Sequence, residues 1–145
     1  MATVNIYLTF NGNCEEAFKF YQSVFGGEIP YMGRFKDMPA GEDFKLKPGE
    51  ENRIMHMSLP ISKETVLMGS DTGGEWASGY SQGNNFSISI TAGSKEEAEK
   101  LFNGLSFGGK VTMPLTKTFW TDSFGTFTDK FGINWMVSFY DAKAH

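Results

Sequence analysis

The spacing of hydrophobic and polar residues along the chain changes from one predicted strand or helix to the next. Val4 to Phe10 is a β-rich run that ends at Asn11-Gly12, so we predict a strand there. From Ala17 to Phe25 the apolar residues recur at the spacing of one helix face. Asn13 is predicted to cap this helix, and Gly26-Gly27 to end it.

Three further strands are predicted in this part of the chain, with one polar stretch among them. The strands cover Glu28 to Phe35, Arg53 to Ile61 and Glu64 to Ser70, and the last two form a hairpin around Ser62-Lys63. Lys36 to Asn52 is polar and contains prolines and glycines, so we predict a mobile excursion there.

The same order of elements recurs after a stretch rich in Gly, Ser and Thr. A strand is predicted over Asn85 to Thr91 and a helix over Ser94 to Leu105. Three strands follow, over Lys110 to Lys117, Ser123 to Thr128 and Asn134 to Tyr140. Each part of the chain therefore has the order βαβββ.

Short motifs repeat together with these elements. Gly12-Asn13-Cys14-Glu15-Glu16-Ala17 matches Gly93-Ser94-Lys95-Glu96-Glu97-Ala98 about 80 residues later. Because neither half buries enough surface alone, we predict one domain over residues 1–145 with its halves packed about a pseudo-twofold axis. The pseudo-repeats cover about 1–71 and 85–145, with a linker at about 72–84 and a groove between the halves.

Charge and composition exclude several classes of partner. The formal net charge is −4, and neither a Lys/Arg cluster nor a Gly-rich phosphate loop is present, which argues against nucleic acid. The chain has no signal-peptide pattern and no long apolar run, so we expect a cytoplasmic protein without a membrane partner. Aromatic residues make up 15% of the chain, enough to fill a core and still line a pocket.

Three segments resemble one known family. They are Phe10 to Tyr21, with its Asn-Gly-Asn-Cys-Glu-Glu-Ala motif, Val66 to Asp71, and Met113 to Met136. Together they resemble the PhnB-like branch of the vicinal oxygen chelate superfamily, which includes glyoxalase I, bleomycin-resistance proteins and extradiol dioxygenases. The resemblance implies an α+β fold in which two tandem βαβββ modules form curved mixed sheets around a groove, and it implies a homodimer.

The resemblance also implies where a catalytic metal would be held. Catalytic members of the superfamily bind a divalent metal through four strand positions, which fall here on Ile6, Met68, Phe86 (or Ser87) and Met136. None of the four principal residues is a ligand for such a cation. We therefore predict no metal and no cofactor. The methyltransferase label attached to this branch is also disfavoured, because both Gly pairs follow helices and do not open a nucleotide-binding turn.

An apolar groove would instead bind a small molecule. Its predicted lining is Ile6, Met68, Phe86 and Met136 with an aromatic wall of Phe119 and Trp120, and Arg34 is a candidate anchor for an anion. Each of these residues also has a plain structural interpretation, as packed core or as a solvated charge.

Two residues are candidates for catalysis. His56 lies mid-strand and Asp71 at a strand end, and a displaced metal site could use both with Glu28 or Glu64. The structural interpretations are favoured, with His56 as a polar-face residue and Asp71 as a turn former. Three functions stay open: a metal-independent binding module, which we favour; a metal-dependent lyase, isomerase or dioxygenase; and a dimeric interaction scaffold.

Overall fold

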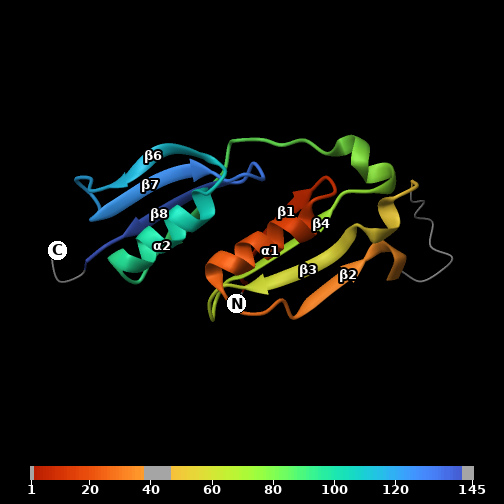
Figure 1. Ribbon diagram of the computed structural model, residues 1–145, viewed down its shortest axis with the longest axis horizontal. Coiled ribbons are helices and arrows are strands. Elements are labelled where there is room, and N and C mark those ends of the chain that lie inside the picture. Colours follow the sequence, from red (N-terminus) through yellow and green to blue (C-terminus); the bar gives the residue numbers. More distant parts are fainter. Residues whose placement is uncertain (1, 38–46, 142–145) are drawn as a thin grey trace. The chain divides into compact units, whose positions relative to one another are not determined.

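The computed structural model describes residues 2–37 and 47–141, apart from the side chains of Glu75 and Trp76 (Figure 1). The chain divides into two compact units, Met1–Ser81 and Gln82–His145. The boundary between them falls inside the predicted linker. Most of the predicted polar excursion, residues 38–46, lies outside the described residues.

The first unit is a four-stranded mixed sheet with one helix packed on it (Figure 1). Its strands have the spatial order β1-β4-β3-β2, and β1 runs parallel to β4. Three short 3₁₀ helices flank the strands. The elements are β1 (Ile6–Phe10), α1 (Cys14–Phe25), β2 (Tyr31–Arg34), η1 (Phe35–Asp37), η2 (Glu50–Asn52), β3 (Ile54–Pro60), β4 (Val66–Asp71) and η3 (Gly74–Gly79).

The second unit repeats this topology with the strand order β5-β8-β7-β6, and β5 runs parallel to β8. Its elements are β5 (Ile88–Thr91), α2 (Lys95–Ser106), β6 (Lys110–Thr116), β7 (Ser123–Thr128) and β8 (Asn134–Phe139). The predicted pair of βαβββ modules and the mixed sheets are therefore confirmed. No helix among the described residues has the length and hydropathy to cross a membrane.

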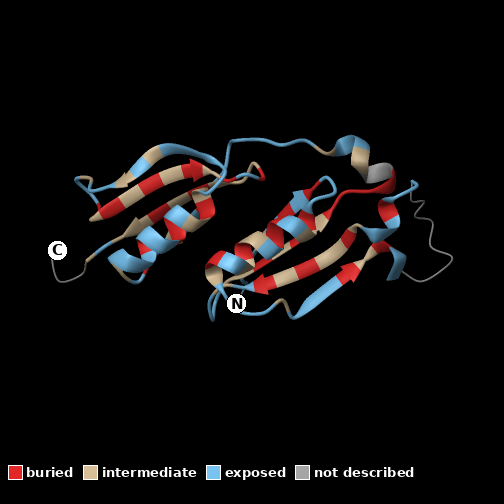
Figure 2. Ribbon diagram, in the orientation of Figure 1, coloured by how far each residue is buried: buried red, intermediate tan, exposed pale blue. Residues whose placement is uncertain are grey.

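The core of each unit lies between its helix and one face of its sheet, where burial alternates along the strands (Figure 2). In the first unit Leu8 and Phe10 of β1 are buried together with Phe18 and Tyr21 of α1. In the second unit Trp135 and Val137 of β8 are buried in the same way. In each unit the α-helix packs on one face of the sheet, and we call the opposite face of that sheet the open face.

The two helices begin differently, although their sequences predict the same cap. At the start of α2 the Ser94 hydroxyl accepts the Glu97 N–H at 3.0 Å, and the Glu97 carboxylate accepts the Gly93 N–H at 2.8 Å. This is a capping box. At the start of α1 Asn13 occupies the predicted N-cap position, but its side chain makes no cap hydrogen bond. A carboxylate from β4, described below, accepts the free N–H groups there.

The end of α1 agrees with the sequence. Gly26 follows the last helical residue with a φ of 81°, a left-handed conformation that favours glycine. Its N–H donates to the carbonyl of Gln22 at 2.8 Å.

Candidate functional site on the open face of the first sheet

Four side chains lie in one line across the open face of the first sheet. Tyr7 of β1 pairs with Met68 of β4, Met68 with Ser58 of β3, and Ser58 with Tyr31 of β2. Residues paired in this way point to the same face of a sheet. Ile6 pairs with the buried Leu67 and so belongs to the helix-covered face.

Three rings on this face form a group that we call the aromatic cluster: Tyr7, His56 and Tyr31. The rings of Tyr7 and His56 are stacked, with centroids 5.7 Å apart, and Tyr7 Oη lies 3.4 Å from His56 Nδ1. The Tyr31 ring lies 5.8 Å from the imidazole on its other side. Tyr7 and Tyr31 stay 49% and 51% exposed, so the cluster has an accessible aromatic surface.

A glycine makes room for one of these rings. Gly33 pairs with His56 across β2 and β3, and the Tyr31 side chain lies over it. A Cβ atom at position 33 would come within 2.7 Å of Tyr31 Oη. The missing side chain thus allows Tyr31 to lie against the sheet beside His56.

A pocket of about 490 Å³ lies further along β1 and β4. We call it the hydroxyl pocket, because five of its seven lining residues carry a hydroxyl group. The lining residues are Thr9, Ser70, Asp71, Thr72, Ser78, Gly79 and Tyr80. Thr9 and Ser70 are paired neighbours in the sheet, two positions beyond Tyr7 and Met68. The pocket therefore continues the same face of the sheet that carries the aromatic cluster.

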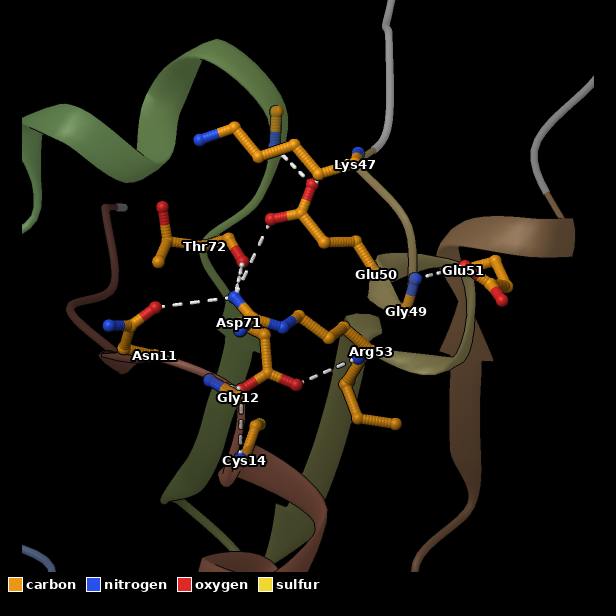
Figure 3. Close-up of polar contacts among 12 residues, drawn as sticks. Asn11, Gly12, Cys14, Lys47, Gly49, Glu50, Glu51, Arg53, Asp71 and Thr72 are labelled. Carbon is orange, nitrogen blue, oxygen red and sulfur yellow. Dashed lines mark hydrogen bonds and ion pairs between the residues drawn. The ribbon is translucent and has the colours of Figure 1, made fainter.

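Asp71, at the end of β4, is buried and accepts three backbone N–H groups (Figure 3). Its Oδ1 accepts those of Gly12 and Cys14, each at 2.9 Å, and its Oδ2 accepts that of Ile54 at 2.9 Å. The carboxylate therefore stands at the positive end of the α1 dipole and ties β1, β3 and α1 together. Its oxygens are occupied by the backbone.

A second carboxylate, Glu50, joins η2 to the segment that leads into η3 (Figure 3). Glu50 Oε1 accepts the N–H groups of Lys47 at 2.7 Å and Gly74 at 3.1 Å. These two backbone hydrogen bonds, with the nearby Arg53, hold the pKa of Glu50 below its usual range. Arg53 Nη1 lies 3.7 Å from Glu50 Oε2 and donates to the Thr72 carbonyl at 3.0 Å.

Arg34, the predicted anion anchor, already has an acidic partner. Its guanidinium pairs with Glu15 of α1 at 3.0 Å and donates to the Asn52 carbonyl at 2.8 Å. Lys19, with Arg34, lowers the pKa of Glu15. Arg34 thus connects β2 to α1 and η2.

Comparison with known proteins agrees with this architecture. Residues 3–137 match the family described as the Glyoxalase/Bleomycin resistance protein/Dioxygenase superfamily. The chain belongs to this superfamily. The resemblance to its PhnB-like branch is confirmed by the relatives that follow.

Three relatives cover nearly the whole chain. Protein YjdN from Escherichia coli (strain K12) is 33% identical over 138 residues, which is 91% of each chain. Protein PA1353 from Pseudomonas aeruginosa is 43% identical, with 97% and 98% of the two chains covered and a TM-score of 0.82. A structure titled as a putative 3-demethylubiquinone-9 3-methyltransferase, PhnB protein, from Bacillus cereus is 26% identical, with 95% and 99% covered and a TM-score of 0.71.

The residues of this superfamily member do not fit the divalent metal that the resemblance implies. Within the described residues, no three His, Cys, Asp or Glu side chains lie close enough together to hold a metal ion. His56 has two tyrosine rings beside it, and Asp71 is occupied by backbone donors. Burial, with the nearby Asp71 and Glu15 charges, raises the pKa of the Cys14 thiol far above its usual value, so Cys14 is also a poor ligand.

The structure brings together some of the predicted site residues and separates others. His56 and Met68 lie on the open face of the first sheet, whereas Ile6 lies on its other face. In the second unit Met136 is half-buried and pairs with Ser89, and Phe86 lies before β5 with 56% exposed.

The predicted aromatic wall lies in the turn between β6 and β7. Phe119 is 96% exposed and packs edge-on against Trp120, with ring centroids 4.7 Å apart. Trp120 in turn contacts Phe124 at 5.6 Å. The Thr118 hydroxyl accepts the N–H groups of Trp120 and Thr121 and so fixes the turn.

Sequence reasoning missed the two tyrosines of the aromatic cluster. The signal for Tyr7 was present, because alternation along Val4 to Phe10 places it opposite Ile6 and Leu8. The sequence carried no such signal for Tyr31. Its place beside His56 depends on the pairing of β2 with β3 and on the space left by the missing side chain of Gly33.

Proposed function

We propose that this protein is a small-molecule binding module that acts without a metal ion, and that its ligand lies on the open face of the first sheet. One observation carries the proposal: the aromatic cluster of Tyr7, His56 and Tyr31 presents half-exposed rings on a paired, rigid sheet. Aromatic rings fixed in this way bind planar or apolar molecules by stacking, with about 0.5–1.5 kcal/mol for each ring pair beyond the area that is buried.

We expect the cluster to prefer uncharged or weakly polar rings. Within the part of the chain that the structure describes, Arg34 and Arg53 both have partners of their own. Neither arginine is therefore free to bind an anionic ligand on the cluster. Phe86, Phe119, Trp120 and Met136 of the second unit remain predictions for the lining of the groove.

A second candidate function, a homodimeric interaction scaffold, is favoured by the exposed aromatic pair in the second unit. Phe119 and Trp120 expose 96% and 42% of their surface. Exposed large rings of this kind are enriched at protein interfaces. If this candidate is right, Phe119→Ser lowers the mass measured by light scattering from dimer to monomer, whereas an unchanged mass contradicts it.

The test of the proposed function is an amide NMR titration of chelator-treated protein with anisole, which has a ring but no hydrogen-bond donor. We expect shifts at Tyr7, Tyr31 and His56 that Tyr7→Ala abolishes. Tyr140→Ala is a matched control, because Tyr140 is also 49% exposed but lies after β8 in the second unit. If the anisole-induced shifts are unchanged in Tyr7→Ala, the proposal is refuted.

A second arm of the same experiment tests the metal. Mn²⁺ broadens the signals of nuclei near its binding site. Localised broadening around His56 that disappears in His56→Ala would overturn the metal-independent reading and favour the metal-dependent enzyme. We expect no localised broadening, since the described residues offer no group of three ligands.

A further inference from the structure

One buried hydroxyl in the first unit has no hydrogen-bond partner. Thr72 is 6% exposed, and its Oγ1 is a buried side-chain oxygen without a partner among the described residues. Its backbone is fixed on both sides, because its N–H donates to the Phe10 carbonyl at 2.7 Å and its own carbonyl accepts from Arg53 at 3.0 Å. A buried hydroxyl left unpaired is costly, and the described residues supply no partner for this one, so it is available to a ligand.

That hydroxyl belongs to the wall of the hydroxyl pocket. Thr72 lines the pocket together with Thr9 and Ser70 of the sheet and Ser78 and Tyr80 at the end of η3. In Figure 3 the Thr72 side chain points away from the Asp71 carboxylate and toward the η3 segment. An unpaired buried hydroxyl in a pocket of about 490 Å³ is typical of a site that binds a polar group.

The lining also defines the charge of that group. Among the described residues, no lysine, arginine or histidine lines the pocket, so they offer an anion no cationic partner there. Asp71, the acidic residue among the described lining residues, already accepts three backbone N–H groups and is not available as a strong partner for a cation. Hydroxyl groups donate and accept, so the lining suits an uncharged group with hydroxyls of its own.

The pocket lies within reach of a ligand on the aromatic cluster. Thr9 follows Tyr7 on the same face of β1, and Ser70 follows Met68 on the same face of β4. Same-face neighbours on a strand are about 6.7 Å apart, roughly the length of one ring. A molecule with a ring and an adjoining polar group would therefore cover both features.

We propose that the hydroxyl pocket is a ligand subsite for an uncharged, polyhydroxylated group, such as a sugar or polyol moiety, and that the Thr72 hydroxyl is its specificity-determining contact. This proposal rests on the proposed function only in one respect, that the ligand also carries a ring that binds the aromatic cluster. The pocket itself is argued from Thr72 and the other lining residues.

The experiment uses four probes and amide NMR on the full chain. Phenyl β-D-glucopyranoside carries ring and hydroxyls, anisole the ring alone, methyl β-D-glucopyranoside the hydroxyls alone, and phenyl phosphate the ring with an anion. We expect phenyl glucoside to bind about three- to tenfold more tightly than anisole, the gain from one or two new hydrogen bonds. Its shifts should include the amides of Thr9, Ser70 and Thr72.

Two threonine variants separate binding from folding. Thr72→Val removes a hydroxyl that has no hydrogen-bond partner among the described residues, so we expect an unchanged or higher melting temperature and loss of the glucoside advantage. Thr121→Val is the matched control: Thr121 is 2% exposed, but its hydroxyl bonds to that of Thr118 at 2.8 Å. That variant should be less stable and should bind phenyl glucoside normally.

The outcomes distinguish the two proposals. If anisole binds the aromatic cluster but phenyl glucoside binds no more tightly, or phenyl phosphate binds most tightly, the subsite is wrong and the proposed function stands. If no ring probe reaches the cluster while methyl glucoside shifts the pocket amides in a Thr72-dependent way, the proposed function is wrong and the subsite stands. Equal glucoside binding by wild type and Thr72→Val overturns the subsite.

Discussion

Replacing Asp71 should show most clearly whether the start of α1 is stabilised by a distant side chain or by its own local sequence. In the structure it accepts the N–H groups of Gly12, Cys14 and Ile54 and so performs the capping that the sequence assigns to Asn13. Asp71→Asn keeps the size of the side chain but removes its charge and one acceptor oxygen. The substitution should therefore destabilise the fold, while Asn13→Ala should not.

The magnitude follows from the contacts. The amide oxygen of an asparagine can keep the bonds from Gly12 and Cys14, but its NH₂ group then faces the buried N–H of Ile54. One unsatisfied buried donor costs about 1–3 kcal/mol. Loss of the negative charge at the start of α1 adds about 0.3–1 kcal/mol. The expected loss is about 1.3–4 kcal/mol, a decrease in melting temperature of about 4–12 °C for a chain of this size.

Urea unfolding followed by circular dichroism measures these differences, with an unchanged denaturant slope as the sign of an unchanged folded state. Asn13→Ala should cost less than about 0.5 kcal/mol. Ser94→Ala is the positive control, because the Ser94 hydroxyl does accept a helix N–H, and it should cost about 1 kcal/mol. The reasoning is refuted if Asn13→Ala costs as much as Ser94→Ala while Asp71→Asn stays within error of wild type.

Two further predictions concern titrating groups. The pKa of Glu50 is lowered in the folded protein, so its contribution to stability is present above its ordinary pKa of 4.5 and is lost as the pH falls through the lower folded value. Glu50→Gln should therefore be less stable at neutral pH and show a flatter loss of urea midpoint in acid; parallel pH profiles for the two proteins would contradict this. Cys14 is fully buried and its thiol pKa is raised, so a thiol reagent should react with it only when urea unfolds the protein. Rapid labelling under native conditions would show that α1 opens locally.

The hydrophobic pattern was sufficient to predict the fold. Both helices and all eight strands were predicted in the correct order, with boundaries within a few residues, because their apolar residues follow helical or alternating periods. Some strands were predicted too long, at ends where the chain has no partner strand. Val4, for example, precedes β1 and is 96% exposed, because a β-forming residue without a partner strand gains nothing from an extended conformation.

The candidate site could be predicted only in part. His56 was recognised from its residue type, but its neighbours Tyr7 and Tyr31 lie 49 and 25 positions away in sequence and meet it only through strand pairing. Arg34 was correctly placed at the end of a strand. Its ion pair with Glu15 could not be foreseen, because helix and strand approach each other only after the core has packed.

The sequence by itself determined the doubled βαβββ order, because periodicity, caps and glycine positions act over a few residues. Only the tertiary structure decided what the polar side chains do. Asp71 caps a helix 57 residues earlier in the chain, and the buried Thr72 hydroxyl, beside a pocket, has no partner within the described part of the chain. Whether a carboxylate or a hydroxyl is structural or available to a ligand depends on which donors the folded chain brings to it, and those donors come from distant segments.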